Sequence, residues 1–167
     1  MSLNALVAPL CHVPLFADLQ PHQMMALVRA ADRVVFQPGD TIIKHDKMGE
    51  AAFLIVQGEA VCLEPDAVDL EGEALEVHTL LGELAMLVET EYSTTVVAQT
   101  VVRTLKFTRA AIFELIEQDP EIAEHFISML SGRLLSVADE LRDLDQQLAE
   151  QSARLATLIP ATQAAPH

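Results

Sequence analysis

Residues that could act as nucleophiles, acids or bases are present in this sequence, but they form no recognisable catalytic arrangement. Ser93 is a candidate nucleophile without evident histidine and acid partners. The carboxylates gather in loops and show no pair that would divide the roles of general acid and general base. We therefore expect a protein that is not an enzyme and has no catalytic residues.

Metal ligands are equally sparse. Cys11 and Cys62 are the 2 cysteines, so neither a disulfide framework nor a four-ligand zinc site has support. A run of acidic residues lacks the alternating acids and the bend glycine of a calcium loop, and we interpret it as a solvated hairpin tip. This tip could steer a basic protein partner that the sequence does not identify. The run comprises Glu64, Asp66, Asp69, Glu71, Glu73 and Glu76.

The overall charge narrows the classes of partner. Among 167 residues, 25 are acidic and 10 are basic, which gives a formal net charge of −15. A surface that binds nucleic-acid phosphates needs clustered Lys and Arg, so a general nucleic-acid binder is excluded. The sequence has neither a secretory leader nor an apolar stretch long enough to span a membrane, and we expect a cytoplasmic protein without a membrane partner.

The elements that must position any site are short strands between helices. Residues 18–31 predict an amphipathic helix, and a second helix follows Thr108 as N-cap and stops at Asp119-Pro120. Strands at hairpin spacing lie between these helices and predict a small barrel or roll. The predicted strands are residues 33–36, 41–43, 52–56, 60–63, 75–80, 94–98 and 101–107.

A much longer helix follows Pro120. Its apolar residues recur at alternating spacings of three and four, which is the heptad seam of a coiled coil. A seam of two positions in seven is too narrow to pack on a globular core along its whole length, so we predict a homodimer. The residues that we expect in the dimer contact are Leu134, Val137, Leu141, Leu144, Leu148 and Leu155.

The order of these elements and several short motifs resemble the cyclic nucleotide-binding domain family, which includes catabolite activator proteins, kinase regulatory subunits and gated channels. The motifs are Phe36-x-Pro-Gly-Asp, Gly49-Glu-x-x-Phe-x-Ile-x-x-Gly, Gly82-Glu-Leu-Ala and Thr95-Val-Val-Ala, within a match that covers residues 15–148. The resemblance implies an α+β, mainly β fold. Its centre is an antiparallel β-roll of the jelly-roll or double-stranded β-helix type, flanked by helices and followed by a long C-terminal dimerisation helix.

This resemblance also implies a division of the chain into three parts. Residues 15–118 would form the roll with its flanking helices, and residues 120–158 would form the dimerisation helix. Residues 159–167 would form a disordered tail.

In this family a phosphate-binding cassette directs backbone N–H groups at the cyclic phosphate. Carried over, Gly82, Leu84 and Ala85 would approach the ligand closely, and Glu83 would accept a hydrogen bond from the ribose hydroxyl. The family's phosphate-clamping arginine is replaced here by Tyr92. The cassette candidates are Gly82, Glu83, Leu84, Ala85, Tyr92, Ser93 and Thr94.

Further departures affect the rest of the pocket. No basic residue lies between Lys47 and Arg103 in the sequence, so a replacement cation would have to come from elsewhere in the chain. In the catabolite activator a Thr-Ser pair on the long helix contacts adenine, whereas the candidates here are Arg133, Val137 and Ala138. Some relatives hold haem through a histidine of the roll, but a lone His78 gives this cofactor little support.

Two functions stay open at this point. The first is a sensory module that dimerises and binds cyclic AMP, cyclic GMP or a related small ligand, which shifts the population of helix packings. The second is a ligand-free dimerising scaffold. The chain has no residues for a helix-turn-helix after the long helix, so we expect no DNA binding by this chain alone, and a transcription regulator would need a separate output domain.

Overall fold

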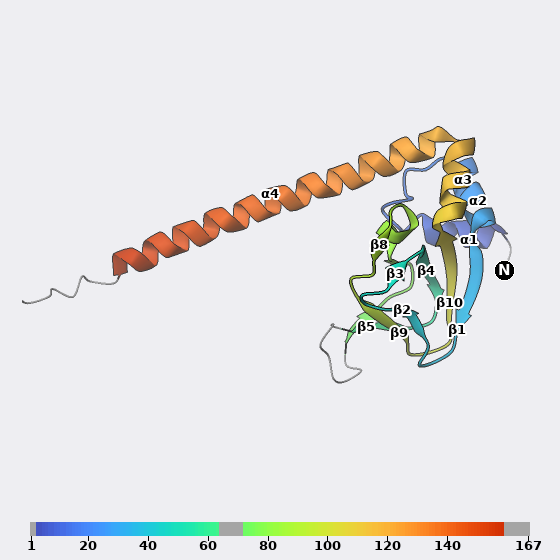
Figure 1. The fold of residues 1–167 in the computed structure, drawn as a ribbon, viewed down its shortest axis with the longest axis horizontal. Coiled ribbons are helices and arrows are strands. Elements are labelled where there is room, and N and C mark those ends of the chain that lie inside the picture. The colour runs from blue at the N-terminus through green and yellow to red at the C-terminus, as the bar shows by residue number, and fades with distance from the viewer. Residues whose placement is uncertain (1–2, 64–71, 159–167) are drawn as a thin grey trace, which may run out of the picture. The chain divides into compact units, whose positions relative to one another are not determined.

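The computed structural model describes residues 3–63 and 72–158, without the side chains of 3–5, 133 and 153–158 (Figure 1). Contacts divide the chain into two units, Met1–His125 and Phe126–His167, which we describe separately. The predicted tail, residues 159–167, and the predicted acidic tip from Glu64 to Glu71 lie outside the described residues. In the described part of the chain, no helix is both long and apolar enough to cross a membrane.

Three helices lie together beside the sheets of the first unit: α1 (Leu3–Leu10), α2 (Pro21–Ala30) and α3 (Arg109–Gln118) (Figure 1). A capping box starts α2, where the Gln20 N–H donates to Gln23 Oε1 at 2.9 Å. Thr108 caps α3 as predicted, because its hydroxyl accepts from the Ala111 N–H. The helix α1 was not predicted, and its Leu6 is buried.

Two four-stranded antiparallel sheets form the roll, in the orders β1-β10-β4-β7 and β2-β9-β5-β6, and β3 pairs with β8. Strand β10 pairs with β1 on one side and with β4 on the other. The fold class predicted from the sequence, a mainly β roll flanked by helices, is confirmed. The strands are β1 (Asp32–Phe36), β2 (Thr41–Ile43), β3 (Met48–Gly49), β4 (Ala51–Gln57), β5 (Ala60–Leu63), β6 (Glu73–Leu75), β7 (Leu80–Leu81), β8 (Thr90–Glu91), β9 (Thr95–Ala98) and β10 (Val102–Thr108).

One predicted strand was wrong. Residues 75–80 do not run as a single strand, because the chain turns at His78, whose φ is 73°. The His78 N–H donates to the Ile55 carbonyl at 2.7 Å, and the Ile55 N–H donates to the Thr79 carbonyl at 3.0 Å. The turn therefore divides the segment into β6 and β7, which belong to different sheets.

Apolar side chains from both sheets fill the interior of the roll. Phe53 and Ile55 from β4 pack there with Val96 from β9 and Val102 from β10. Phe36 meets Phe53 edge to face, with ring centroids 5.9 Å apart. This filled interior supports the loops that carry the cassette candidates, and Tyr92 packs against it.

The helix α4 (Pro120–Leu158) begins in the first unit and forms the described part of the second. Its heptad positions carry leucine and valine side chains that are more than half exposed in the single chain. The side chain of Leu155 is outside the description. The exposed seam positions are Leu134, Val137, Leu141, Leu144 and Leu148.

Candidate functional site

The cassette candidates lie on a short 3₁₀ turn, η1 (Glu83–Met86), that follows β7. Gly82 starts this turn in the left-handed region, with φ 65° and ψ 35°, where glycine has no steric cost. The Ala85 N–H donates to the Gly82 carbonyl at 3.0 Å. Within the turn, the side chain of Ala85 is buried, whereas that of Leu84 is 48% exposed. The sequence therefore located the turn correctly.

Tyr92 fills the space beside the two glycines of the cassette region. A Cβ atom built on Gly82 would lie 2.5 Å from Cε1 of the Tyr92 ring, and one built on Gly49 would lie 3.1 Å from that ring. The Tyr92 hydroxyl donates to the Ala51 carbonyl at 2.7 Å. The ring thus lies against the backbone at both positions where glycine permits close approach, and its one polar group is satisfied inside the chain.

A cation reaches the cassette from α3. Arg109 Nε donates to the Ala85 carbonyl at 3.1 Å, and its Nη2 donates to the Gly49 carbonyl at 2.6 Å. Its Nη1 lies 3.6 Å from Oε1 of Glu89. The Arg109 side chain is 21% exposed. This guanidinium therefore connects η1 to β3, and the N–H groups named here donate to, or lie near, oxygen atoms of the same chain.

Backbone bonds hold the rest of the candidate loop beside β3. The Tyr92 N–H donates to the Lys47 carbonyl at 2.9 Å, and the Asp46 N–H donates to the Tyr92 carbonyl at 3.1 Å. These bonds bring the exposed residue Lys47 next to Tyr92. Ser93 is exposed and Thr94 is half-buried, so the two lie at the outer side of the loop.

The model of the family described as "Cyclic nucleotide-binding domain" matches residues 33–119, which is more than half of the chain. The chain belongs to this family. The match covers the strands from β1 to β10 and the whole of α3, including the cassette with Tyr92 and Arg109. The resemblance seen in the sequence is thereby confirmed.

Curated proteins are also similar to this chain. The cAMP-dependent protein kinase regulatory subunit of Aspergillus fumigatus is 30% identical over 104 residues, which is 62% of this chain and 25% of that protein. The chain thus spans about a quarter of the length of this curated relative.

Solved structures give the same fold. The N-terminal domain of a transcriptional regulator from Streptomyces coelicolor matches with a TM-score of 0.70 and 24% identity, over 80% of this chain and 94% of that one. The catabolite activator protein of Thermus thermophilus matches with a TM-score of 0.62 and 28% identity, over 79% of this chain and 63% of that one. Domains of this family are regulatory.

The base-side candidates of the family's pocket belong to the second unit. Val137 is 53% exposed and Ala138 is half-buried on α4, while the side chain of Arg133 lies outside the description. The cassette lies in the first unit, so a role for these three residues in a shared site stays a prediction.

His78, the candidate haem ligand, packs against another histidine. Its ring stacks on His12 with centroids 4.4 Å apart and an interplanar angle of 13°. His12 in turn approaches the Ala8 carbonyl through Nδ1 at 2.9 Å. Within the described ranges, no group of three or more His, Cys, Asp or Glu side chains is placed to hold a metal ion.

Sequence reasoning missed Arg109 and Lys47 as cassette neighbours. Both are brought there by pairings between segments far apart in the chain, and neither stands in a motif that marks it. The only available signal for Arg109 was its place directly after the N-cap of α3.

Proposed function

We propose that this chain is a dimerising regulatory scaffold of the cyclic nucleotide-binding domain family, in which Tyr92 holds the cassette closed without a bound nucleotide. The observation that carries this proposal is the position of the Tyr92 ring against Gly49 and Gly82, with its hydroxyl bonded to Ala51. The module has no catalytic step and works in the cytoplasm, where a further protein receives its signal.

The charges near the cassette support closure. A cyclic phosphate needs a cation, and a charge-assisted hydrogen bond contributes about 1.5–3 kcal/mol. Arg109 already donates to two carbonyl oxygens and lies beside Glu89. Glu89 and Glu91 add negative charge at the exposed side of the same loop. An anionic ligand would therefore meet acids, a neutral tyrosine and an arginine whose donors are already bonded to protein oxygens.

The exposed seam of α4 supports the dimer. Residues 134–148 span about 20 Å of helix at 1.5 Å per residue, and the apolar positions on this stretch follow one stripe. Full burial of a leucine or valine contributes about 1.5–3 kcal/mol. A parallel second copy would cover the seam positions with identical side chains, which is how a heptad repeat is satisfied.

Two measurements on the full chain test the proposal. Calorimetric titration with cyclic AMP and cyclic GMP at millimolar concentration should give no binding heat and no shift of the melting temperature. Sedimentation without nucleotide should give a dimer. A clear nucleotide-dependent rise in melting temperature would contradict closure, and a monomer at micromolar concentration would contradict the scaffold.

A Tyr92→Arg variant serves as the positive control for the titration. It restores the residue type that the family uses, and it removes the ring that occupies the space beside Gly82. We expect this variant to bind cyclic AMP at least tenfold more tightly than the parent chain. Arg29→Gln is the matched control, because Arg29 is exposed on α2 outside the cassette and its substitution leaves both Tyr92 and Arg109 in place.

The relatives favour a second candidate function, a sensor that binds a cyclic nucleotide or a related small ligand. The Aspergillus relative is a cAMP-dependent kinase subunit, and Lys47 lies beside Tyr92 as a nearby cation. In this mechanism the ligand would displace Tyr92 and shift the packing of α3. The Streptomyces structure, a domain of a transcriptional regulator, favours an output through a separate domain. The same titration separates the two candidates.

A further inference from the structure

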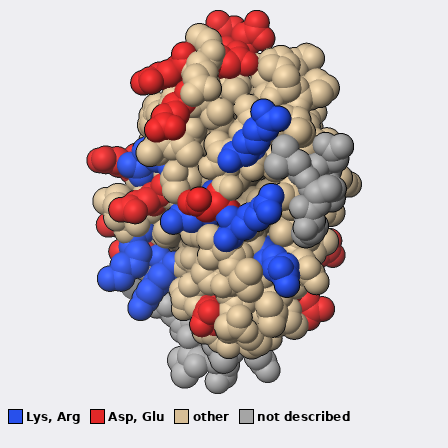
Figure 2. Space-filling model, turned by 90° about the vertical axis from the view of Figure 1, so that its right-hand side faces the viewer, with Lys and Arg blue, Asp and Glu red and all other residues tan. Residues whose placement is uncertain are grey.

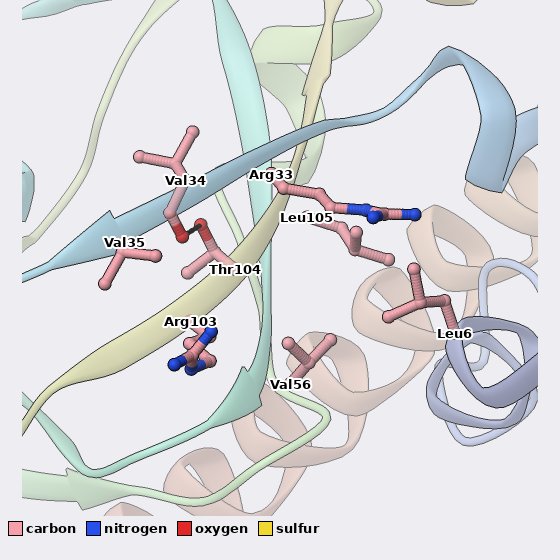
Figure 3. Close-up of a pocket in the computed structure, with 8 residues that line it drawn as sticks. All are labelled: Leu6, Arg33, Val34, Val35, Val56, Arg103, Thr104 and Leu105. Atoms are coloured by element: carbon pink, nitrogen blue, oxygen red, sulfur yellow. Dashed lines mark hydrogen bonds between the residues drawn. The ribbon is translucent and has the colours of Figure 1, made fainter. Parts of the chain in front are cut away.

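A second hollow lies on the outer face of the sheet β1-β10-β4-β7, apart from the cassette. It is a cavity of about 140 Å³ between α1 and the strands β1, β4 and β10, entirely within the first unit (Figure 3). None of its lining residues is a cassette candidate. Its apolar side chains come from Leu6, Val35, Val56 and Leu105. Val34 also lines it, but Val34 alternates with Arg33 and Val35 along β1, so its side chain points to the opposite face of the sheet.

Two arginines line the same cavity from neighbouring strands. In the β1–β10 register Arg33 pairs with Leu105, and Arg103 pairs with Val35. Directly paired residues point to the same side of a sheet, so both guanidinium side chains emerge on this face, at diagonal positions (Figure 3). Diagonal neighbours of this kind have Cα atoms about 7–8 Å apart.

Neither arginine has a counter-ion in the part of the chain that the structure describes. Both side chains are exposed, and neither makes a hydrogen bond or ion pair with a described residue. This arrangement is unusual in a chain with a net charge of −15. Lys and Arg side chains, with Asp and Glu side chains among them, lie across the middle of the face that Figure 2 shows. Both arginines are charged donors without a described acceptor, so an anion bound at this face would have two guanidinium groups available to it.

The side chains that line the cavity indicate the chemistry of the part of the ligand that does not contact the arginines. Leu6 and Leu105 are buried, and Val35 is 47% exposed at the margin. The hydroxyl of Thr104, the remaining lining residue, already donates to the Val34 carbonyl at 3.3 Å. Apart from the two guanidinium groups, the side chains of the wall therefore offer carbon atoms. A closed apolar cavity of about 150 Å³ holds a molecule of the size of benzene, so the apolar part of this more open hollow has room for a body of about that size or smaller.

We propose that this cavity binds a small monocarboxylate whose apolar body is about the size of a benzene ring. The body lies against Leu6, Val56 and Leu105, and the carboxylate accepts hydrogen bonds from Arg33 and Arg103. The site is independent of Tyr92 and of any nucleotide. The module would thus bind a small carboxylate, a class of ligand different from the cyclic nucleotides that the cassette of this family binds.

Benzoate is the probe for a titration of the full chain, followed by amide chemical shifts and by calorimetry. We expect saturable binding with shifts that centre on β1 and β10. Arg33→Gln and Arg103→Gln should each weaken benzoate binding by about three- to tenfold, because each removes one charged donor at an exposed site. Arg29→Gln is the matched control, since Arg29 is an exposed arginine of α2 outside the cavity, and it should leave the affinity unchanged.

Two further arms test the pocket and the charge separately. Benzyl alcohol, which has the ring without the carboxylate, should bind at least tenfold more weakly than benzoate. Val56→Leu adds a methylene group to the wall and should weaken benzoate binding while the spectrum of the folded chain is kept. The proposal is overturned by absence of binding at 10 mM benzoate, a concentration on the order of the weakest specific affinities. Equal binding of benzyl alcohol, or unchanged affinity in both arginine variants or in Val56→Leu, would also overturn it.

Discussion

The cassette of the first unit and the heptad seam of the second differ in whether their side chains have contacts within the single chain. At the cassette, Tyr92 and Arg109 make their hydrogen bonds to carbonyl oxygens of the same chain. On α4, Leu134, Leu141 and Leu148 are more than half exposed within the single chain. The first arrangement is complete without another molecule, whereas the second stabilises the protein only when a partner covers it.

This difference bears on how the module works. In the proposed closed cassette the packed state needs no ligand, so its stability would be a property of the monomer's own contacts. An exposed apolar stripe contributes nothing until it is buried, so its stabilisation depends on protein concentration. Substitutions in the two regions should therefore be distinguishable by whether their effects change with concentration.

The largest expected effect comes from the seam. Leu144→Glu places a charge at a position that both copies would bury, and it removes two leucine contributions of about 2 kcal/mol each from the dimer. We expect the dimer dissociation constant to rise by about 1000-fold. Analytical ultracentrifugation measures this constant. Asp143→Asn changes a neighbouring exposed position outside the seam and should leave the dissociation constant unchanged. If the Leu144→Glu chain still dimerises at the concentration at which the parent chain does, the seam is not the dimer contact.

Arg109→Met should have the next largest effect, and this effect should not depend on protein concentration. It removes the charged donors to Gly49 and Ala85, which are both buried, and leaves two carbonyl oxygens without their partner. We expect the free energy of unfolding in urea to fall by about 3 kcal/mol. Arg29→Met should cost less than about 1 kcal/mol, because Arg29 is exposed. Equal losses in the two variants would show that Arg109 does not fix the cassette.

Gly82→Ala should lower the free energy of unfolding by about 2 kcal/mol, through a left-handed backbone and a contact with the Tyr92 ring. In the Tyr92→Ser background the contact disappears and only the backbone cost remains. A double-mutant cycle between these positions should therefore show a coupling energy above about 0.5 kcal/mol. Strict additivity would mean that the ring does not lie beside Gly82 in solution.

Tyr92→Phe should have the smallest effect. It keeps the ring and removes the hydroxyl that donates to Ala51, so we expect a loss of about 1 kcal/mol in the free energy of unfolding. The ring still occupies the cassette, and cyclic AMP should still give no binding heat. Nucleotide binding by this variant, with none by the parent chain, would show that the single hydrogen bond closes the cassette.

Much of the fold could be predicted because its signals are local. The N-cap at Thr108, the stop at Asp119-Pro120 and the heptad spacing of α4 each occupy a few neighbouring residues. The turn at His78 was missed, because it depends on hydrogen bonds to Ile55 in another strand. The helix α1 was missed because Pro9 lies inside it and because neither an acidic first turn nor a basic last turn marks its ends.

The candidate site could be predicted only in part. The motif Gly82-Glu-Leu-Ala located the turn, and the family pattern showed that Tyr92 stands where an arginine is usual. The partner of the Tyr92 hydroxyl could not be predicted, because Ala51 is 41 positions away in the chain. Arg109 was missed for the same reason, since its Gly49 contact spans 60 positions.

Arg109 also has a mechanical consequence. It is the first residue of α3, and its side chain donates to η1 at 3.1 Å and to β3 at 2.6 Å. A displacement of the cassette turn would therefore be passed to the first turn of α3 through the Arg109 side chain. Such a coupling would not require a ligand, because both hydrogen bonds lie within the chain.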